Sequence, residues 1–181
     1  MSLLWLIPLT LLFSLAYASA SGAPWVPTFK RDIERAKKLL DLKPGEKFVE
    51  LGCGDGRVVI GVTSSRLPSF RKEGLGGGPR LRAVGVELSI IQWIVAQIRR
   101  SLTRSWNVRF VLGNAFAYDL RDADAVYMFL LPETYEKIRP KLEAELKPGA
   151  RVVTFVWPVQ GWNPEKIDEM VGASKLYLYV R

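Results

Sequence analysis

The chain has 181 residues, of which 49% are hydrophobic and 24% are charged, and its 26 Lys and Arg exceed its 18 Asp and Glu to give a net charge of +8. This composition is typical of one folded domain and excludes a disordered tail. The absence of histidine excludes a Ser-His-Asp triad and an imidazole metal site. The single cysteine, Cys53, excludes an intramolecular disulfide and suits a reducing compartment, and we expect no metal.

Residues 1–23 form an uncharged, strongly apolar N-terminal region. Its length is close to the ~20 residues that a helix needs to cross a bilayer. The basic residues from Lys30 to Lys38 follow it, and such clusters stay on the cytoplasmic side of a membrane. We therefore expect a hydrophobic helix that forms a single-pass membrane anchor, with the rest of the chain facing the cytoplasm. Two alternatives remain open: a cleaved signal peptide ending near Ala20, and a misassigned start or buried core segment.

Residues 24–181 form the second region, in which apolar periodicity alternates between that of helices and that of strands. Strands are expected at 48–51, 83–86, 108–112, 125–130, 152–157 and 175–180. Helices are expected at 29–40, 57–65, 90–102, at 133–146 with a break at Pro140, and in a short segment opened by Asn163-Pro164. Thr28 is placed to cap the first helix. The alternation predicts an α/β fold with a Rossmann-like sheet of six or seven mostly parallel strands and helices on both faces.

Residues 66–80 interrupt this alternation with a glycine-rich, basic segment that has no periodicity. Its glycines do not indicate a phosphate loop, because no strand precedes them and Pro79 follows where a helix would have to start. The segment is expected to be a flexible surface insertion.

A second glycine-rich stretch lies between the first expected strand and the helix after it, and contains Gly52, Gly54 and Gly56. Glycine permits backbone torsions that side chains forbid and lets a ligand approach the carboxyl edge of a sheet closely. The spacing is GxGxG, which differs from the dinucleotide pattern GxGxxG, and no Lys-Ser or Lys-Thr follows as in a P-loop. The stretch therefore predicts a cofactor other than NAD or ATP.

Two acids lie beside this loop. Glu50 precedes it and suits an ammonium group, and Glu87 ends the next strand, where a carboxylate can accept both hydroxyls of a ribose. The alternative is a tight turn flanked by two exposed acids without a ligand.

These features resemble the class I S-adenosylmethionine-dependent methyltransferases, and the resemblance covers about residues 24–181. It implies S-adenosylmethionine as cofactor. The cofactor-binding residues that it implies are Glu50, Gly52, Cys53, Gly54, Asp55, Gly56, Glu87, Asn114 and Ala115. The chain departs from the family pattern in the 66–80 insertion and in Asn114, which stands where an aspartate is common. An asparagine amide can still meet an adenine edge, with both a donor and an acceptor.

A narrower resemblance links several short motifs in order, from Pro24-Trp25-Val26-Pro27-Thr28 through GCGDGR, AVGVE, MFLLPE and PKLEAELKPGARVV to Gly161-Trp162-Asn163-Pro164. Together they are similar to the small non-SET protein-lysine methyltransferases, which include archaeal soluble and mitochondrial membrane-anchored members. The resemblance implies a catalytic domain that methylates lysine in membrane-associated proteins, with lipid contacted by the N-terminal region. Trp25 replaces the tyrosine usual in that family. The substrate contacts that we expect are Trp25, Pro27, Thr28, Leu131, Pro132 and Trp162.

Other acceptors remain open. Nucleic acid is the less expected one, because Leu130-Leu131-Pro132-Glu133 stands where amino methyltransferases of nucleic acids carry an Asn or Asp-Pro-Pro-aromatic run. The alternatives are a methyltransferase acting on RNA or a small molecule, and a non-catalytic cofactor-binding membrane adaptor. Transfer to lysine needs a neutral amine, which aromatic walls from Trp25, Phe129, Trp157 and Trp162 would favour by desolvation. No general base is assigned, with Glu133 and Tyr127 as candidates acting through water.

Overall fold

The computed structural model describes Pro8 and residues 26–64 and 81–181. Most of the expected anchor, Trp25 and the 66–80 insertion lie outside the described residues. Within the described part, no helix is long and apolar enough to cross a membrane.

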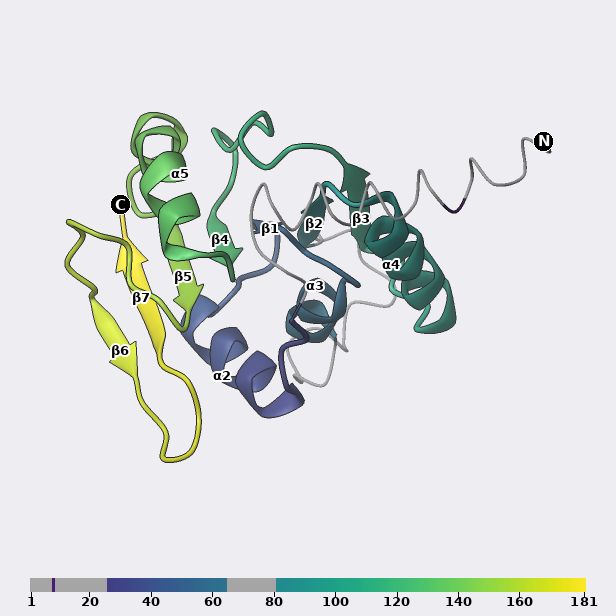
Figure 1. Cartoon of the computed structure of the whole chain (residues 1–181), viewed down its shortest axis with the longest axis horizontal. Coiled ribbons are helices and arrows are strands. Elements are labelled where there is room, and N and C mark those ends of the chain that lie inside the picture. Colours follow the sequence, from purple (N-terminus) through teal and green to yellow (C-terminus); the bar gives the residue numbers. More distant parts are fainter. Residues whose placement is uncertain (1–7, 9–25, 65–80) are drawn as a thin grey trace.

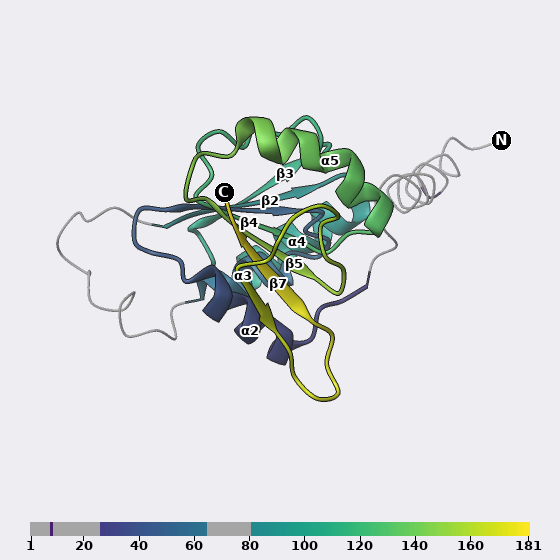
Figure 2. The same cartoon turned by 90° about the vertical axis from the view of Figure 1, so that its left-hand side faces the viewer.

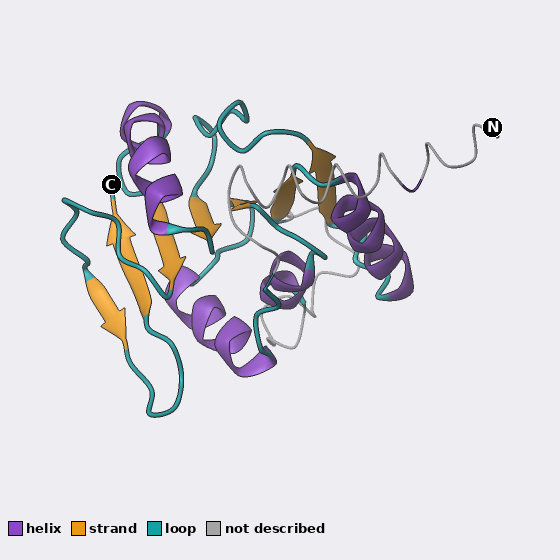
Figure 3. Ribbon diagram, in the orientation of Figure 1, coloured by secondary structure: helices purple, strands orange, loops and turns teal. Residues whose placement is uncertain are grey.

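A seven-stranded sheet forms the centre of the fold, with the strand order β3-β2-β1-β4-β5-β7-β6 (Figures 1 and 3). The strands are β1 (Lys47–Leu51), β2 (Arg82–Glu87), β3 (Val108–Leu112), β4 (Ala125–Met128), β5 (Arg151–Phe155), β6 (Lys166–Asp168) and β7 (Leu176–Val180). β1 to β5 are parallel to one another, whereas β7 is antiparallel to both β5 and β6. The expected mostly parallel sheet is confirmed, and its parallel carboxyl ends meet at one edge.

Helices cover both faces of the sheet (Figure 2). The four helices described besides the N-terminal region are α2 (Lys30–Leu40), α3 (Arg57–Thr63), α4 (Ile90–Leu102) and α5 (Pro132–Glu145). Alternation along β1 explains the two layers, because successive side chains of a strand point to opposite faces. Phe48 is buried in the core that contains Val58 of α3, and Val49 is buried in the core that contains Ile138 of α5.

Three local expectations are wrong. Helix α5 continues through Pro140 without a break. Pro140 is exposed, so water can bind the carbonyl of the preceding turn that proline leaves without a backbone partner. The buried side chains of Tyr135 and Ile138 hold the helix on the sheet. No helix follows Asn163; the chain there forms β6, because pairing with β7 outweighs the local preference. Phe29 takes the N-cap position of α2 without a side-chain cap, so Thr28 does not cap that helix.

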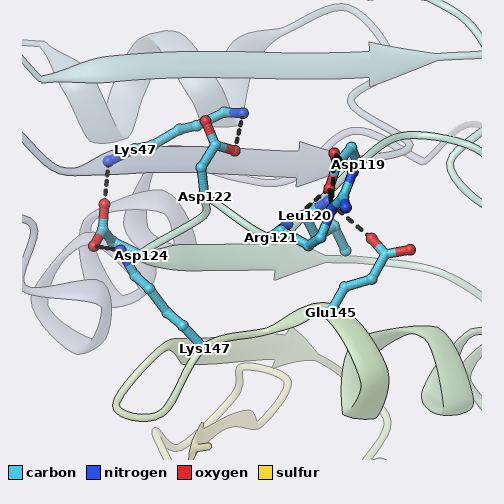
Figure 4. A network of polar contacts seen from close by, with 8 residues as sticks. All are labelled: Lys47, Asp119, Leu120, Arg121, Asp122, Asp124, Glu145 and Lys147. Atoms are coloured by element: carbon cyan, nitrogen blue, oxygen red, sulfur yellow. Dashed lines mark hydrogen bonds and ion pairs between the residues drawn. The ribbon is translucent and has the colours of Figure 1, made fainter.

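The loop between β3 and β4 contains no helix and is fastened at the amino edge of the sheet, where β1, β4 and β5 begin (Figure 4). Asp124 accepts a 2.7 Å hydrogen bond from the Lys47 amide and forms an ion pair with Lys147. Glu145 of α5 accepts a 2.9 Å hydrogen bond from the Leu120 amide. These charged groups hold the loop together with the packing of Leu120 and Ala123, which are fully buried in the core on the α5 side of the sheet.

Candidate functional site

A cavity of about 370 Å³ opens at the carboxyl edge of the parallel strands. Its walls come from the loops after β1, β2, β3, β4 and β5 and from the segment before α2. The structure brings together there most of the residues expected to bind the cofactor: Glu50, Gly52, Cys53, Gly54, Asp55, Glu87, Asn114 and Ala115. Gly56 does not line the cavity and is the N-cap residue of α3.

The backbone amides of the glycine loop are used inside the protein. Gly52 and Cys53 both donate to the Val86 carbonyl at 2.9 and 3.0 Å, and Gly54 donates to Oε2 of Glu87 at 2.8 Å. A phosphate-binding loop would instead point such amides at its ligand. The loop therefore suits a cofactor that is recognised through carboxylates.

All three glycines of the loop are required by the backbone. Gly52, Gly54 and Gly56 have φ angles of 75°, 52° and 73°, in the left-handed region that side chains rarely adopt. At Gly56 an added Cβ would also collide with the Phe110 ring. Glycine at these positions lets the chain turn sharply from β1 into α3 at the floor of the cavity.

Glu87 is 7% exposed, and its two carboxylate oxygens face the loops on either side. Oε2 accepts the Gly54 amide, and Oε1 accepts the Ser89 amide at 2.8 Å. Burial raises the pKa of Glu87, although these backbone donors partly oppose the shift. A carboxylate offers about four acceptor positions and the backbone donors use three of them, so Glu87 remains able to accept a hydroxyl group from the cavity.

Glu50 is 3% exposed and also lines the cavity. Its Oε2 accepts the Val59 amide at 3.0 Å, in the first turn of α3. Burial raises its pKa well above the ordinary value, and the nearby carboxylates of Asp55 and Glu87 add to the shift. A positively charged ligand group beside Glu50 would offset this burial, which fits the expected ammonium group.

The Asp55 and Cys53 side chains have different surroundings. The Asp55 carboxylate forms ion pairs with Arg57 at 2.7 Å and with Arg99 at 2.6 Å. Burial opposes its ionisation, but the two guanidinium groups outweigh burial and lower the pKa of Asp55. Burial raises the pKa of the Cys53 thiol well above its ordinary value, which keeps the thiol neutral.

Asn114 stands where the class I methyltransferases commonly have an aspartate. The orientation of its side-chain amide is defined by a hydrogen bond. Its Oδ1 accepts the Phe116 amide at 2.9 Å. The atom that faces the Phe116 N–H must be an acceptor, so it is the amide oxygen of Asn114. The amide nitrogen of Asn114 then remains available as a donor. Asn114 can therefore donate a hydrogen bond to a ring nitrogen of an adenine.

The residues expected to contact the substrate are only partly brought together. Pro27, Thr28 and Leu131 line the cavity, beside Phe129 and Trp157. Pro132 lies outside the cavity lining, as the first residue of α5. Trp25 lies outside the described residues.

Trp162 is not among the residues that line the cavity. Its ring packs edge-on against Tyr179 at 5.4 Å, and its Nε1 donates to Glu143 of α5 at 2.8 Å. These contacts belong to the core on the α5 side of the sheet. The candidate bases Glu133 and Tyr127 also lie outside the cavity lining, and burial raises the pKa of Tyr127 well above its ordinary value.

Several residues of the cavity wall were not expected from the sequence, among them Ser89, Gln92 and Val156. Ser89 is the N-cap of α4, and the spacing from Ser89 to Gln92 is a capping pattern that would have located it. Val156 follows β5 with a φ of 73°, a conformation that no feature of the sequence indicates for a valine.

The fold and the cavity define a class I S-adenosylmethionine-dependent methyltransferase, and similar solved structures support this. An RNA methyltransferase from Salinibacter ruber in complex with S-adenosyl-L-homocysteine superposes with a TM-score of 0.73 and 29% identity, over 86% of this chain and 93% of that chain. A methyltransferase from Thiobacillus denitrificans, also with S-adenosyl-L-homocysteine, has a TM-score of 0.57 and 17% identity over 72% and 49% of the two chains, and it supports the fold alone.

Residues 50–166 match the model of the ANTKMT methyltransferase domain, and the chain belongs to this family. It is 34% identical to a protein-lysine N-methyltransferase of Saccharolobus islandicus, over 87% of this chain and 92% of that protein. It is 33% identical to the adenine nucleotide translocase lysine N-methyltransferase of Mus musculus, over 78% and 56%. The chain thus spans nearly the whole archaeal relative but little more than half of the mouse one.

Proposed function

We propose that this methyltransferase transfers the methyl group of S-adenosylmethionine to lysine side chains of proteins at a membrane. The observation that carries the proposal is the apolar acceptor side of the cavity, formed by Phe129, Leu131 and Trp157 beside the segment of Val26 and Pro27. The relatives named above as protein-lysine methyltransferases support the same acceptor.

The apolar walls supply what lysine methylation requires. S-adenosylmethionine, when bound, carries an activated methyl group on a sulfonium. Desolvation by Phe129 and Trp157 disfavours the charged ammonium, so the lysine amine enters in its neutral form. The amine lone pair forms the new N–C bond while the S–C bond breaks, and the product ammonium returns its proton to water. Alignment of the amine supplies most of the acceleration.

Glu50 and Glu87 then act on the cofactor side. Both carboxylates are buried, and burial raises the pKa of each. Hydroxyl groups at Glu87 and an ammonium group at Glu50 favour the ionised carboxylates. Binding of the cofactor is therefore expected to release protons and to strengthen as the pH rises through the raised pKa values.

The location at a membrane rests on the sequence of the N-terminal region. Residues 1–23 are uncharged and apolar, and the basic cluster from Lys30 to Lys38 follows them. A single-pass anchor with the catalytic domain facing the cytoplasm would hold that domain beside membrane-associated substrates. Full-length protein is then expected to pellet with membranes and to resist carbonate extraction. A mature chain that begins near Ser21 and is recovered outside the cytoplasm would contradict the anchor.

RNA is the second candidate acceptor, because the Salinibacter ruber structure named above, at 29% identity, is an RNA methyltransferase. The net charge of +8 also permits it. The deciding experiment incubates the full chain with radiolabelled S-adenosylmethionine and a membrane extract, in parallel with extract treated with RNase and extract whose lysines are acetylated. We expect label on lysine, identified by mass spectrometry, that survives RNase and is lost on acetylation. Label that is lost with RNase and retained on acetylation would make RNA the acceptor.

A further inference from the structure

A second cavity, of about 440 Å³, lies next to the cofactor cavity. The two cavities share four wall residues, Val26, Pro27, Phe129 and Val156. The other walls of the second cavity come from α2, from the end of β5 and from the segment before β7. Any group that lies in the second cavity is therefore separated from the cofactor cavity only by these shared residues.

Val156 is a strained residue in this shared wall. A β-branched side chain at a φ of 73° is a true outlier, and such strain persists only where the surroundings hold it. Its amide donates to the Lys175 carbonyl at 2.9 Å, and the Thr154 hydroxyl donates to the Trp157 carbonyl at 2.8 Å across the same turn. The two bonds fix the turn in which Val156 contributes to both cavities.

The second cavity is mainly apolar. Phe129 and Phe155 pack edge-on at 4.9 Å on one side, and Phe29 is 68% exposed at the rim. Beyond these walls, the neighbouring segment carries the exposed side chains of Met170 and Val171. This surface offers contact to apolar side chains of a partner.

The charged groups of the second cavity are already paired. Asp32 is 1% exposed and forms ion pairs with Arg35 at 2.9 Å and with Arg31 at 3.7 Å. Arg31 also donates to the Gly172 carbonyl at 2.7 Å. The negative charge of Asp32 is already balanced by two arginines, so it attracts a lysine ammonium only weakly. The second cavity therefore does not bind the target lysine in its charged, unreactive form.

We propose that the second cavity binds an apolar side chain of the substrate next to the target lysine, and that Val156 is the specificity-determining residue that aligns the lysine between the two cavities. The inference rests on the proposed function and narrows its substrate class to lysines in an apolar sequence context. The shared wall indicates which group occupies the second cavity. When the target lysine reaches into the cofactor cavity, the neighbouring side chains of the substrate stay outside that cavity and meet the second one across the shared wall.

The test compares two peptides in which norleucine replaces the lysine, so that binding is measured without methyl transfer. One peptide has leucines beside the norleucine, and the other has serines. We expect the full-length protein in detergent to bind the leucine peptide at least about tenfold more tightly, as burial of one apolar side chain implies. Phe29→Asp should remove most of that preference, and Leu102→Asp, at an 80% exposed position of α4, should leave it intact.

The matching lysine peptides give the second readout. Val156→Gly relieves the backbone strain and should keep the fold and the cofactor affinity, while kcat for the leucine-flanked lysine falls by about tenfold or more because alignment is lost. Equal binding of the two norleucine peptides, or an unchanged preference in Phe29→Asp, would overturn the proposal for the second cavity. An unchanged kcat in Val156→Gly would overturn the role of Val156. If the leucine peptide binds as expected but its lysine form is not methylated, the proposed function fails while the second cavity stands as a binding site.

Discussion

Two pairs of carboxylates, one pair at each edge of the parallel sheet, have pKa values that are shifted in opposite directions. At the amino edge, Asp124 and Glu145 face lysines and backbone amides, which outweigh the effect of burial and lower the pKa of both groups (Figure 4). At the carboxyl edge, Glu50 and Glu87 are buried beside the cavity, and burial raises the pKa of both. The first pair has its countercharges within the protein, and the second pair lacks them.

This difference indicates that the carboxylates at the amino edge stabilise the fold, whereas Glu50 and Glu87 at the carboxyl edge serve ligand binding. A carboxylate whose pKa is lowered stabilises the folded chain in its ionised form, whereas one whose pKa is raised destabilises the folded chain when it ionises. Buried acids without a countercharge persist where a ligand supplies the missing charge or hydrogen bonds. The following variants test whether the two edges separate in this way.

The largest effect is expected from Gly54→Val at the carboxyl edge. Valine is strained at a φ of 52°, and a shift of this backbone would break the hydrogen bond from the Gly54 amide to Glu87. Binding of S-adenosylmethionine should fall by more than about 100-fold, as measured by calorimetry, with a native circular dichroism spectrum. Gly149→Val is the matched control, because valine has the same backbone strain there at a φ of 82°, while the position lies outside the cavity lining, so binding should persist. If Gly54→Val bound S-adenosylmethionine with the affinity of the wild type, the assignment of the glycine loop to the cofactor site would be wrong.

The second effect compares one acid from each edge. Glu87→Ala should weaken cofactor binding by roughly 1 to 3 kcal/mol, because bonds from hydroxyl groups to the carboxylate are lost. Asp124→Ala should leave binding unchanged and lower the melting temperature by a few degrees, because the Lys47 amide and the Lys147 ammonium lose their partner. If Asp124→Ala weakened cofactor binding as much as Glu87→Ala, the separation of the two edges would be wrong.

The third effect concerns the pH dependence of stability at Glu50. Its folded-state pKa is raised, so the folded chain holds this proton more tightly than the unfolded chain, and the wild type loses stability as the pH rises from about 4.5 through that raised pKa. Glutamine does not titrate, and its oxygen can still accept the Val59 amide. Glu50→Gln should raise the melting temperature of the cofactor-free protein by a few degrees at pH 8 and by less at pH 4. A lower melting temperature at pH 8 would show that ionised Glu50 stabilises the empty cavity.

The sequence predicted those features that depend on local pattern. The alternation of apolar runs located every described strand except β6, and the spacing of Gly52, Gly54 and Gly56 located the cavity, because both follow from backbone geometry over a few residues. The sequence did not reveal that Trp162 packs on Tyr179 of β7, because no local pattern shows which face of the sheet a loop crosses. Val156 was missed because its conformation is imposed by bonds to Lys175 and within its own turn.

The smallest effect is expected from the Asp119–Arg121 pair, although the pKa of Asp119 is held far below its ordinary value by the Arg121 hydrogen bonds. The two side chains are 54% and 76% exposed, so water already solvates both charges and screens their attraction. Holding two flexible side chains in one geometry also costs entropy, which offsets much of the remaining attraction. Asp119→Asn should therefore leave the melting temperature and the cofactor affinity within experimental scatter. The better-buried partner in the same network, Glu145, gives the contrast, because Glu145→Gln should lower the melting temperature by weakening the ion pair with Lys141. If Asp119→Asn were the more destabilising of the two, burial would not be what makes the amino edge stable.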